Sequence, residues 1–466
     1  MPEQRSLTAY VAEFAVNTRY EDIPDEVMRL GKKSILDALG VALSGSISAP
    51  GRIVRDYLRG LGCTEGKASV IGSPLQLQPR FAALANGIAM HADDFDDTLQ
   101  AETGRYQGVH PTSPVLAAVL AVAESTQLSG KQLLSAYHVG VEVCCRVFDA
   151  THVNHTLNGF HVTGTCGTIG TAAGVANLAR VNEQTARTML GIAGSMSSGL
   201  QANVGTMVKS FHAGHAAECG IVAYDLAARG FSASRIVLES PRGFFRAQGG
   251  GHEDNRMRGK LGKPWSFVDR GIWLKAFPTG SLGHPAMTKL LELILEHDIK
   301  PHQVSRIRVT TSESNHHTLQ HHRPRTELEA KFSLEFFLAA LLLERRCGLP
   351  QFTDEYVNRR EVQEMIDRVD YTTYSDAEAK ANGYNIVTTF LDIDLKEGRT
   401  ISARADHGKG HIANPMSEDE VAAKFSDCAE YARWPKIKAE RAIELILRLE
   451  ALDDVSELTA LLRAGS

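Results

Sequence analysis

A short acidic segment holds the densest group of chemically capable side chains in the sequence. Four aspartates follow His91 within six positions: Asp93, Asp94, Asp96 and Asp97. Carboxylates this close repel one another, so the segment needs solvent, bound cations, helix N-terminal amides or a functional role. The mostly apolar residues 81–90 precede it, which indicates that the acidic segment emerges directly from a buried helix. This position favours a functional site over an ordinary surface loop.

One hypothesis for these carboxylates is metal-diphosphate binding. Asp93, Asp94 and Asp97 fit the Asp-Asp-x-x-Asp pattern with which helical terpene synthases hold Mg²⁺ against a diphosphate. Those enzymes carry a second metal motif, and the sequence contains none. The hypothesis is therefore weak.

A second hypothesis combines the acidic segment with histidines and a lysine elsewhere. His110 and His284 stand directly beside Gly or Pro, and His161 follows Gly159 by two positions. At such places an irregular segment meets a predicted helix, and a side chain can face a cleft. Lys209 and His212 are three positions apart and share one helical face. Cations bind carboxylates, and an imidazole or a carboxylate moves protons. Together these residue types suit a small anionic substrate.

Composition excludes several classes of protein. The 466 residues allow two or three domains, and 50 basic against 55 acidic residues argue against a nucleic-acid binder. The polar N-terminal residues predict no signal peptide, and the longest apolar runs, 114–123 and 336–343, are far shorter than the roughly 20 residues of a membrane span. Seven scattered cysteines without a Cys-x-x-Cys pair indicate a reducing compartment. We expect a soluble, cytoplasmic protein without a membrane or nucleic-acid partner.

The hydrophobic pattern predicts a mainly α fold with two domains. Residues up to about 230 are a succession of helical patterns, and the small residues of 164–179 predict a helix packed on all sides. From about 273 the pattern is mixed, with predicted strands at 304–311, 385–394 and 400–405, and helices return after Pro415. We expect a discontinuous all-helical domain, 1–272 with 405–466, and an inserted α+β domain, 273–404.

Five segments resemble, in their order and spacing, the MmgE/PrpD family: 91–98, 160–167, 209–220, 277–285 and 331–336. This family includes 2-methylcitrate dehydratase, cis-aconitate decarboxylase and iminodisuccinate epimerase. The resemblance covers essentially the whole chain. It implies a large helical domain built from both chain ends, a smaller α+β lid domain, a homodimer, an active site between the domains and no iron–sulfur cluster.

The resemblance also nominates the residues of the site. It implies a small di- or tricarboxylate substrate and neither a metal nor an organic cofactor. The nominated catalytic residues are Asp94, His161, Lys209 and His110. The nominated substrate-binding residues are Thr98, His212 and His284. The sequence departs from the family in residues 99–109, eleven positions between Thr98 and His110 where the family has only a handful. This enlarged loop contains Glu102, Arg105 and Tyr106, which are candidates for substrate selection.

The implied reaction cleaves a bond next to a carboxylate through an enolate-like state. We expect a lyase that dehydrates or decarboxylates its substrate, with Lys209 and histidines holding carboxylates and with Asp94 and His161 transferring protons. An epimerase of a dicarboxylate such as iminodisuccinate is the alternative within the family. A non-catalytic carboxylate sensor is the alternative from another class, although a sensor needs no proton-transfer group.

Overall fold

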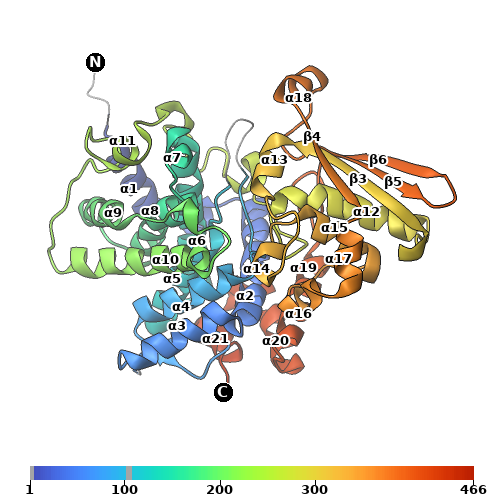
Figure 1. The fold of residues 1–466 in the computed structure, drawn as a ribbon. Helices are drawn as coiled ribbons and strands as arrows, with labels where there is room; N and C mark the ends of the chain where they lie inside the picture. The colour runs from blue at the N-terminus through green and yellow to red at the C-terminus, as the bar shows by residue number, and fades with distance from the viewer. Residues whose placement is uncertain (1–4, 64, 101–107, 466) are drawn as a thin grey trace. The chain divides into compact units, whose positions relative to one another are not determined.

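The computed structural model describes residues 5–63, 65–100 and 108–465 (Figure 1). Helices contain 59% of the residues and strands 9%, which confirms the predicted mainly α fold with a smaller α+β part. The contacts between Cα atoms separate the chain into two compact units. The first unit takes its residues from both ends of the chain, up to residue 272 and from residue 417, and residues 273–416 belong to the second. Whether these units are the domains expected from the sequence remains a prediction.

The first unit consists almost entirely of helices (Figure 1). Its helices are α1 (Leu7–Asn17), α2 (Asp25–Ser46), α3 (Ala49–Gly60), α4 (Pro79–Ala92), α5 (Thr112–Ser125), α6 (Gly130–Ala150), α7 (Asn154–Leu157), α8 (Val162–Leu178), α9 (Glu183–Met196), α10 (Met207–Ala228), α11 (Phe244–Gly249), α19 (Glu418–Tyr431), α20 (Lys436–Leu447) and α21 (Ser456–Leu461). A short antiparallel pair, β1 (Ala68–Ser69) with β2 (Gln76–Leu77), accompanies them. Among the described residues, no helix is both long enough and apolar enough to cross a bilayer.

Helix α8 lies at the centre of this unit, as its small residues predict. All of its residues are buried, and it packs against α5, α6, α9 and α10. A Cβ atom at Gly170 would lie 2.5 Å from the Cβ atom of Cys144 and 2.6 Å from the carbonyl oxygen of Gly140. Since real Cβ atoms do not approach neighbours so closely, α8 and α6 can pack backbone to backbone only because Gly occupies this position.

The second unit contains a four-stranded sheet in the order β4-β3-β5-β6 (Figure 1). The strands are β3 (Val304–Ser312), β4 (Val369–Tyr374), β5 (Thr389–Leu395) and β6 (Thr400–Ala405). Strands β3 and β4 are parallel, whereas β3 with β5 and β5 with β6 are antiparallel. The helices of this unit are α12 (His284–Glu296), α13 (Glu313–Thr318), α14 (Glu327–Ala330), α15 (Leu334–Glu344), α16 (Asp354–Val357), α17 (Arg360–Ile366) and α18 (Asp376–Asn382). Helices α12 and α15 contact the sheet, and their apolar residues join its buried side chains in one core.

Two details of the strands differ from the sequence prediction. Strand β5 begins at Thr389 rather than at Asn385, because Asn385 and Thr388 close a turn in which the Thr388 N–H donates to the Asn385 carbonyl oxygen at 3.2 Å. Strand β4 was not predicted at all. Its residues Val369–Tyr374 are mixed polar and β-branched, and only pairing with β3, more than fifty residues earlier, makes them a strand.

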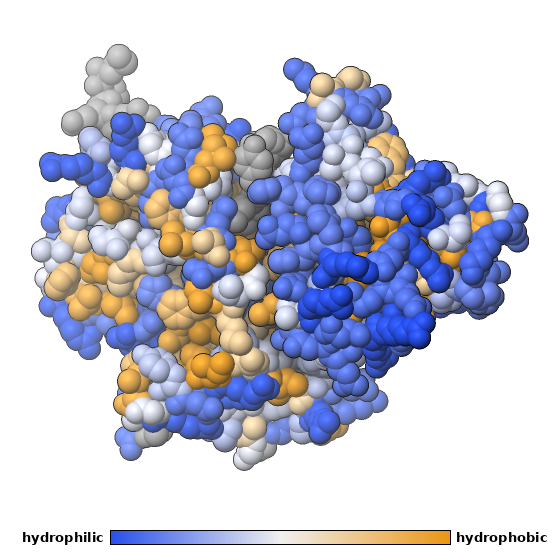
Figure 2. All heavy atoms as spheres, viewed as in Figure 1, coloured by the Kyte–Doolittle hydropathy of each residue, from blue (hydrophilic) through white to orange (hydrophobic). Residues whose placement is uncertain are grey.

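Large apolar side chains remain exposed on the first unit. Met207, Val208 and Phe211 at the start of α10 are 42%, 40% and 43% exposed. Figure 2 shows that apolar residues also gather on the drawn face of this unit's helices. Exposed apolar groups of this kind are typical of protein interfaces. The homodimer implied by the family resemblance remains a prediction.

Candidate active site

The four aspartates after α4 are buried, not solvated. Helix α4 ends at Ala92, with Asp93 as its C-cap, and Asp94 then takes a φ of +52° in the left-handed region. Asp93 accepts a hydrogen bond from the Ser44 hydroxyl of α2 at 2.6 Å. The exposed fractions of Asp93, Asp94, Asp96 and Asp97 are 8%, 4%, 0% and 1%. The chain therefore turns inward after α4 and carries its carboxylates into the interior of the helical unit, where each must find a partner.

Lys209 is the partner of Asp94. The two side chains form an ion pair in which both residues are at least nine-tenths buried. Lys209 lies in the first turn of α10, whose N-cap Thr206 accepts a hydrogen bond from the Val208 N–H. An ammonium group has three N–H donors. Lys209 can therefore remain on Asp94 and still hold the carboxylate of a ligand.

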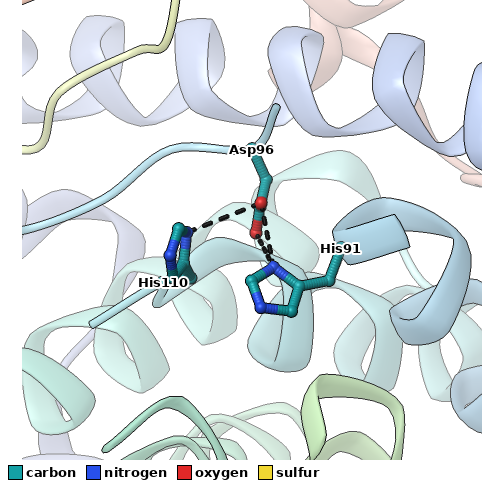
Figure 3. Close-up of side chains that lie close together, drawn as sticks. All are labelled: His91, Asp96 and His110. Atoms are coloured by element: carbon teal, nitrogen blue, oxygen red, sulfur yellow. Dashed lines mark hydrogen bonds and ion pairs between the residues drawn. The ribbon is translucent and has the colours of Figure 1, made fainter. Parts of the chain in front are cut away.

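His91, Asp96 and His110 lie together (Figure 3), and the charges of Lys209 and Asp94 act on His91. His91 Nδ1 lies 2.9 Å from each carboxylate oxygen of Asp96. His110 Nδ1 lies 2.8 Å from the main-chain oxygen of Asp97 and 3.5 Å from Asp96 Oδ1. Because a ring N–H donates to an oxygen at hydrogen-bond distance, we assign the Nδ1–H tautomer to both imidazoles. Their Nε2 atoms then carry the lone pairs.

His161 and His212 extend this group of rings. His161 is the N-cap of α8, and its Nδ1 lies 2.9 Å from Nδ1 of His212 on α10. Ring centroids are 4.6 Å apart for His91 and His110, 6.2 Å for His91 and His161, and 5.0 Å for His161 and His212. These four residues, His91, His110, His161 and His212, are called the histidine cluster below.

Three rings of the histidine cluster, those of His91, His161 and His212, have pKa values that favour their neutral form. Burial lowers the pKa of His161 well below its ordinary value, and the charges of His91 and Lys209 lower it further. Burial is also the main cause that lowers the pKa of His91 and brings the pKa of His212 to about 4. Uncharged imidazoles beside one ammonium group form a site that offers hydrogen bonds and a positive charge to an anion.

Thr98 lies at the base of the enlarged loop. Its hydroxyl donates to the Val109 carbonyl oxygen at 3.3 Å, and Leu99 and Val109 exchange two main-chain hydrogen bonds of 2.8 and 2.9 Å. Residues 101–107, which include Glu102, Arg105 and Tyr106, lie outside the described residues. Their part in substrate selection remains a prediction.

His284 belongs to the second unit, where it begins α12. Its Nε2 lies 3.1 Å from the Thr279 hydroxyl, and the residue is 5% exposed. A Cβ atom at Gly408 would lie 2.7 Å from the carbonyl carbon of His284, so only Gly at this position permits the observed packing. The structure thus brings Asp94, Lys209 and three predicted histidines together within the first unit. The role expected for His284 remains a prediction.

Sequence reasoning did not nominate two residues of this site, His91 and Asp96. Both stand in the acidic segment, but neither was assigned a role. His91 lies at the end of α4 and Asp96 lies five positions later, a spacing that allows their side chains to meet. Lys424 of α19 was also missed. Its ammonium donates to the Phe95 carbonyl oxygen at 2.7 Å, more than 300 residues away in the sequence. No local pattern could reveal that contact.

Two imidazoles and a carboxylate are ligands that transition metals accept, and the donor atoms of His91, Asp96 and His110 lie within 4.8 Å of one another. Both Nδ1 atoms, however, already donate their protons to oxygen atoms at 2.8–2.9 Å. A metal that binds through these Nδ1 atoms would have to replace both protons. The expected absence of a metal cofactor remains a prediction.

Asp97 is a carboxylic acid held in its neutral form. Burial raises its pKa from the ordinary 3.8 to about 8, and a hydrogen bond of 2.5 Å from the Thr112 hydroxyl only partly opposes this. In the unfolded chain the group titrates near about 4. The folded protein therefore keeps a proton that the unfolded chain releases. Its contribution to stability is fully present below a pH of about 4 and is lost as the pH rises toward about 8, at up to ~1.4 kcal/mol per pH unit.

Asp97→Asn is expected to remove this pH dependence, because the amide cannot ionise. The free energy of unfolding of the wild type, relative to that of the variant, should fall by roughly 2–4 kcal/mol between about pH 5 and about pH 8. Urea unfolding at several pH values measures it. Asp56→Asn, at a side chain that is 73% exposed, is the control. Its free energy of unfolding should depend on pH in the same way as that of the wild type. Parallel curves for the wild type and Asp97→Asn would contradict the assignment.

Comparison with known families finds two matches that cover most of the chain. The MmgE/PrpD N-terminal domain matches residues 9–256, and the MmgE/PrpD C-terminal domain matches residues 277–451. Among curated relatives, the cis-aconitate decarboxylase of Homo sapiens is 29% identical, over 99% of this chain and 95% of the relative. That of Mus musculus is 27% identical, over 99% and 94%. That of Aspergillus terreus is 26% identical, over 98% and 96%.

Proposed function

The chain belongs to the MmgE/PrpD family, and from this premise we propose that it is a lyase that decarboxylates a small tricarboxylate of the cis-aconitate type. Curated relatives matched over nearly their whole length carry the name cis-aconitate decarboxylase, which favours decarboxylation over dehydration. The observation that carries the proposal is the buried ion pair of Lys209 with Asp94 beside the histidine cluster. Such a site supplies both a cation for carboxylates and groups that carry protons.

Decarboxylation needs three things from a protein. The bond between a carbon atom and one carboxylate breaks, carbon dioxide leaves, and the electron pair passes into carbons that are conjugated with another carboxylate. One proton then adds to carbon. The protein must therefore orient the leaving carboxylate, stabilise the negative charge that develops, and deliver the proton.

Lys209 is the group proposed to stabilise the negative charge. Its ammonium is held by Asp94 in the buried interior, where an electrostatic interaction is stronger than in water. Asp94 then serves to orient Lys209, which leaves His161 as the candidate for proton transfer. His110, His212 and Thr98 are proposed to position the substrate, and His284 to contribute from the second unit.

A substrate panel tests this proposal and separates it from its alternatives. The purified protein is incubated with cis-aconitate, citrate, 2-methylcitrate and iminodisuccinate in turn. We expect cis-aconitate to release carbon dioxide and yield an equal amount of an unsaturated dicarboxylate, measured by NMR. A new alkene absorbance from a citrate would instead indicate a dehydratase. Deuterium exchange without net conversion would indicate an epimerase, and binding of these acids without turnover would indicate a sensor.

A further inference from the structure

His91 has two properties that the proposed function leaves unexplained. Its side chain is fully buried, and its Nε2 atom has no hydrogen-bond partner among the described residues. Its Nδ1 atom, in contrast, faces both oxygens of the Asp96 carboxylate (Figure 3). A buried acceptor without a partner is unfavourable unless something else uses it. The ring thus presents an available lone pair on one side and a carboxylate on the other.

Within the histidine cluster, His91 makes a close contact with a carboxylate, since both Asp96 oxygens lie 2.9 Å from its Nδ1 atom. His110 donates to a main-chain oxygen, with Asp96 more distant at 3.5 Å. His161 and His212 share one hydrogen between their Nδ1 atoms. A carboxylate that is hydrogen-bonded to one ring nitrogen stabilises a positive charge on that ring more than a carbonyl or another imidazole does. If the cluster takes up a proton, His91 is the ring best placed to hold it.

From this arrangement we infer that His91 takes up a proton at Nε2 when a carboxylate ligand binds, and that Asp96 is the positioning residue that holds the Nδ1–H. In this step the Nε2 lone pair accepts one proton from solvent, the Nδ1–H remains on Asp96, and no other bond changes. The inference rests on the proposed function only in taking the ligand to be a carboxylate.

The charges around His91 explain why a ligand is needed. Burial and Lys209 keep the pKa of His91 below its ordinary value, although Asp96 and Asp94 act in the opposite direction. The groups that face this ring are Asp94, Asp96, Lys209, His110, His161 and His212. Lys209 is the one cation among them, and a bound tricarboxylate adds negative charge that more than offsets it. The pKa of His91 should therefore rise on binding, with net proton uptake at neutral pH.

Calorimetric titration with tricarballylate tests the inference. This saturated tricarboxylate has neither a hydroxyl group nor a double bond, so it can be neither dehydrated nor decarboxylated. Binding heats measured in buffers of different ionisation enthalpy give the number of protons taken up, and we expect about one per ligand for the wild type. His91→Asn keeps an N–H for Asp96 but lacks Nε2, and it should lose this uptake. His155→Asn, which removes a buried ring of the same unit outside the histidine cluster, should retain it.

A second measurement does not depend on any ligand. In protein labelled with ¹⁵N-histidine, the ligand-free His91 signal, identified by its absence in His91→Asn, should show the neutral Nδ1–H tautomer. Asp96→Leu, which removes the acceptor of the Nδ1–H, should abolish that preference. Unchanged proton uptake in His91→Asn, or an Nε2–H tautomer in the wild type, would overturn the inference. Proton uptake that depends on His91 without any turnover of cis-aconitate would uphold it and refute the proposed decarboxylation.

Discussion

Replacing Lys209 by Met is expected to reduce kcat/KM for the tricarboxylate substrate by at least about 1000-fold. The substitution keeps the length and the apolar stem of the side chain but removes the ammonium that is paired with Asp94 in the buried site. The charge of Lys209 lowers the pKa of His91, His161 and His212 alike. Steady-state kinetics with cis-aconitate measures the loss, and full retained activity would refute the role of Lys209.

The loss must be separated from unfolding, because Lys209→Met leaves the Asp94 carboxylate buried without its cation. The double variant Lys209→Met with Asp94→Asn removes both charges and should fold, as judged by circular dichroism and thermal unfolding, yet remain inactive. Lys32→Met is the matched control. It removes an ammonium that binds Glu450 and the Leu447 carbonyl oxygen in the same unit, away from the histidine cluster, and it should leave kcat/KM unchanged.

Lys424→Met is expected to lower the free energy of unfolding by roughly 3–5 kcal/mol. The Lys424 ammonium lies 2.6 Å from Asp37 Oδ1 of α2 and donates to the Phe95 carbonyl oxygen. It also lies 3.6 Å from the centroid of the Phe95 ring. Without it, the buried Asp37 carboxylate loses this ion pair, and α19 loses its contact with the acidic segment.

Urea unfolding of the wild type and of Lys424→Met measures this effect. Lys436→Met, at a side chain that is 90% exposed and pairs with Glu440 on the helix surface, should change the free energy of unfolding by less than about 1 kcal/mol. Adding Asp37→Asn to Lys424→Met should restore part of the lost stability. If Lys424→Met lowers the free energy of unfolding as little as Lys436→Met does, the buried pair of Lys424 and Asp37 contributes little to stability.

The sequence was sufficient to predict the features that depend on neighbouring residues. Hydrophobic periodicity and β-branched residues predicted the helical parts of the chain and the strands β3, β5 and β6. The motifs around Asp94, His161 and Lys209 were recognised because each is continuous in the sequence, and these residues meet in the first unit.

Features that depend on distant partners could not be predicted. Strand β4 exists because it pairs with β3. The neutral state of Asp97 depends on how completely other helices bury it, and the contact of Lys424 with Phe95 joins opposite ends of the chain. His91 and Asp96 were visible as residue types, but only the 2.9 Å distance between their side chains in the fold identifies them as a pair.

The left-handed backbone of Asp94 has a consequence for how this protein can change. A residue with a side chain pays a conformational penalty at a φ of +52°, which Gly avoids and Asn tolerates better than most. Asp94→Gly or Asp94→Asn would relieve that penalty, which is about 1 kcal/mol. Either change would also leave the buried Lys209 ammonium without the carboxylate that holds it, which destabilises by roughly 3–5 kcal/mol. The ion pair therefore outweighs the backbone strain, and directed evolution for heat resistance should retain Asp at this position even when turnover is not scored.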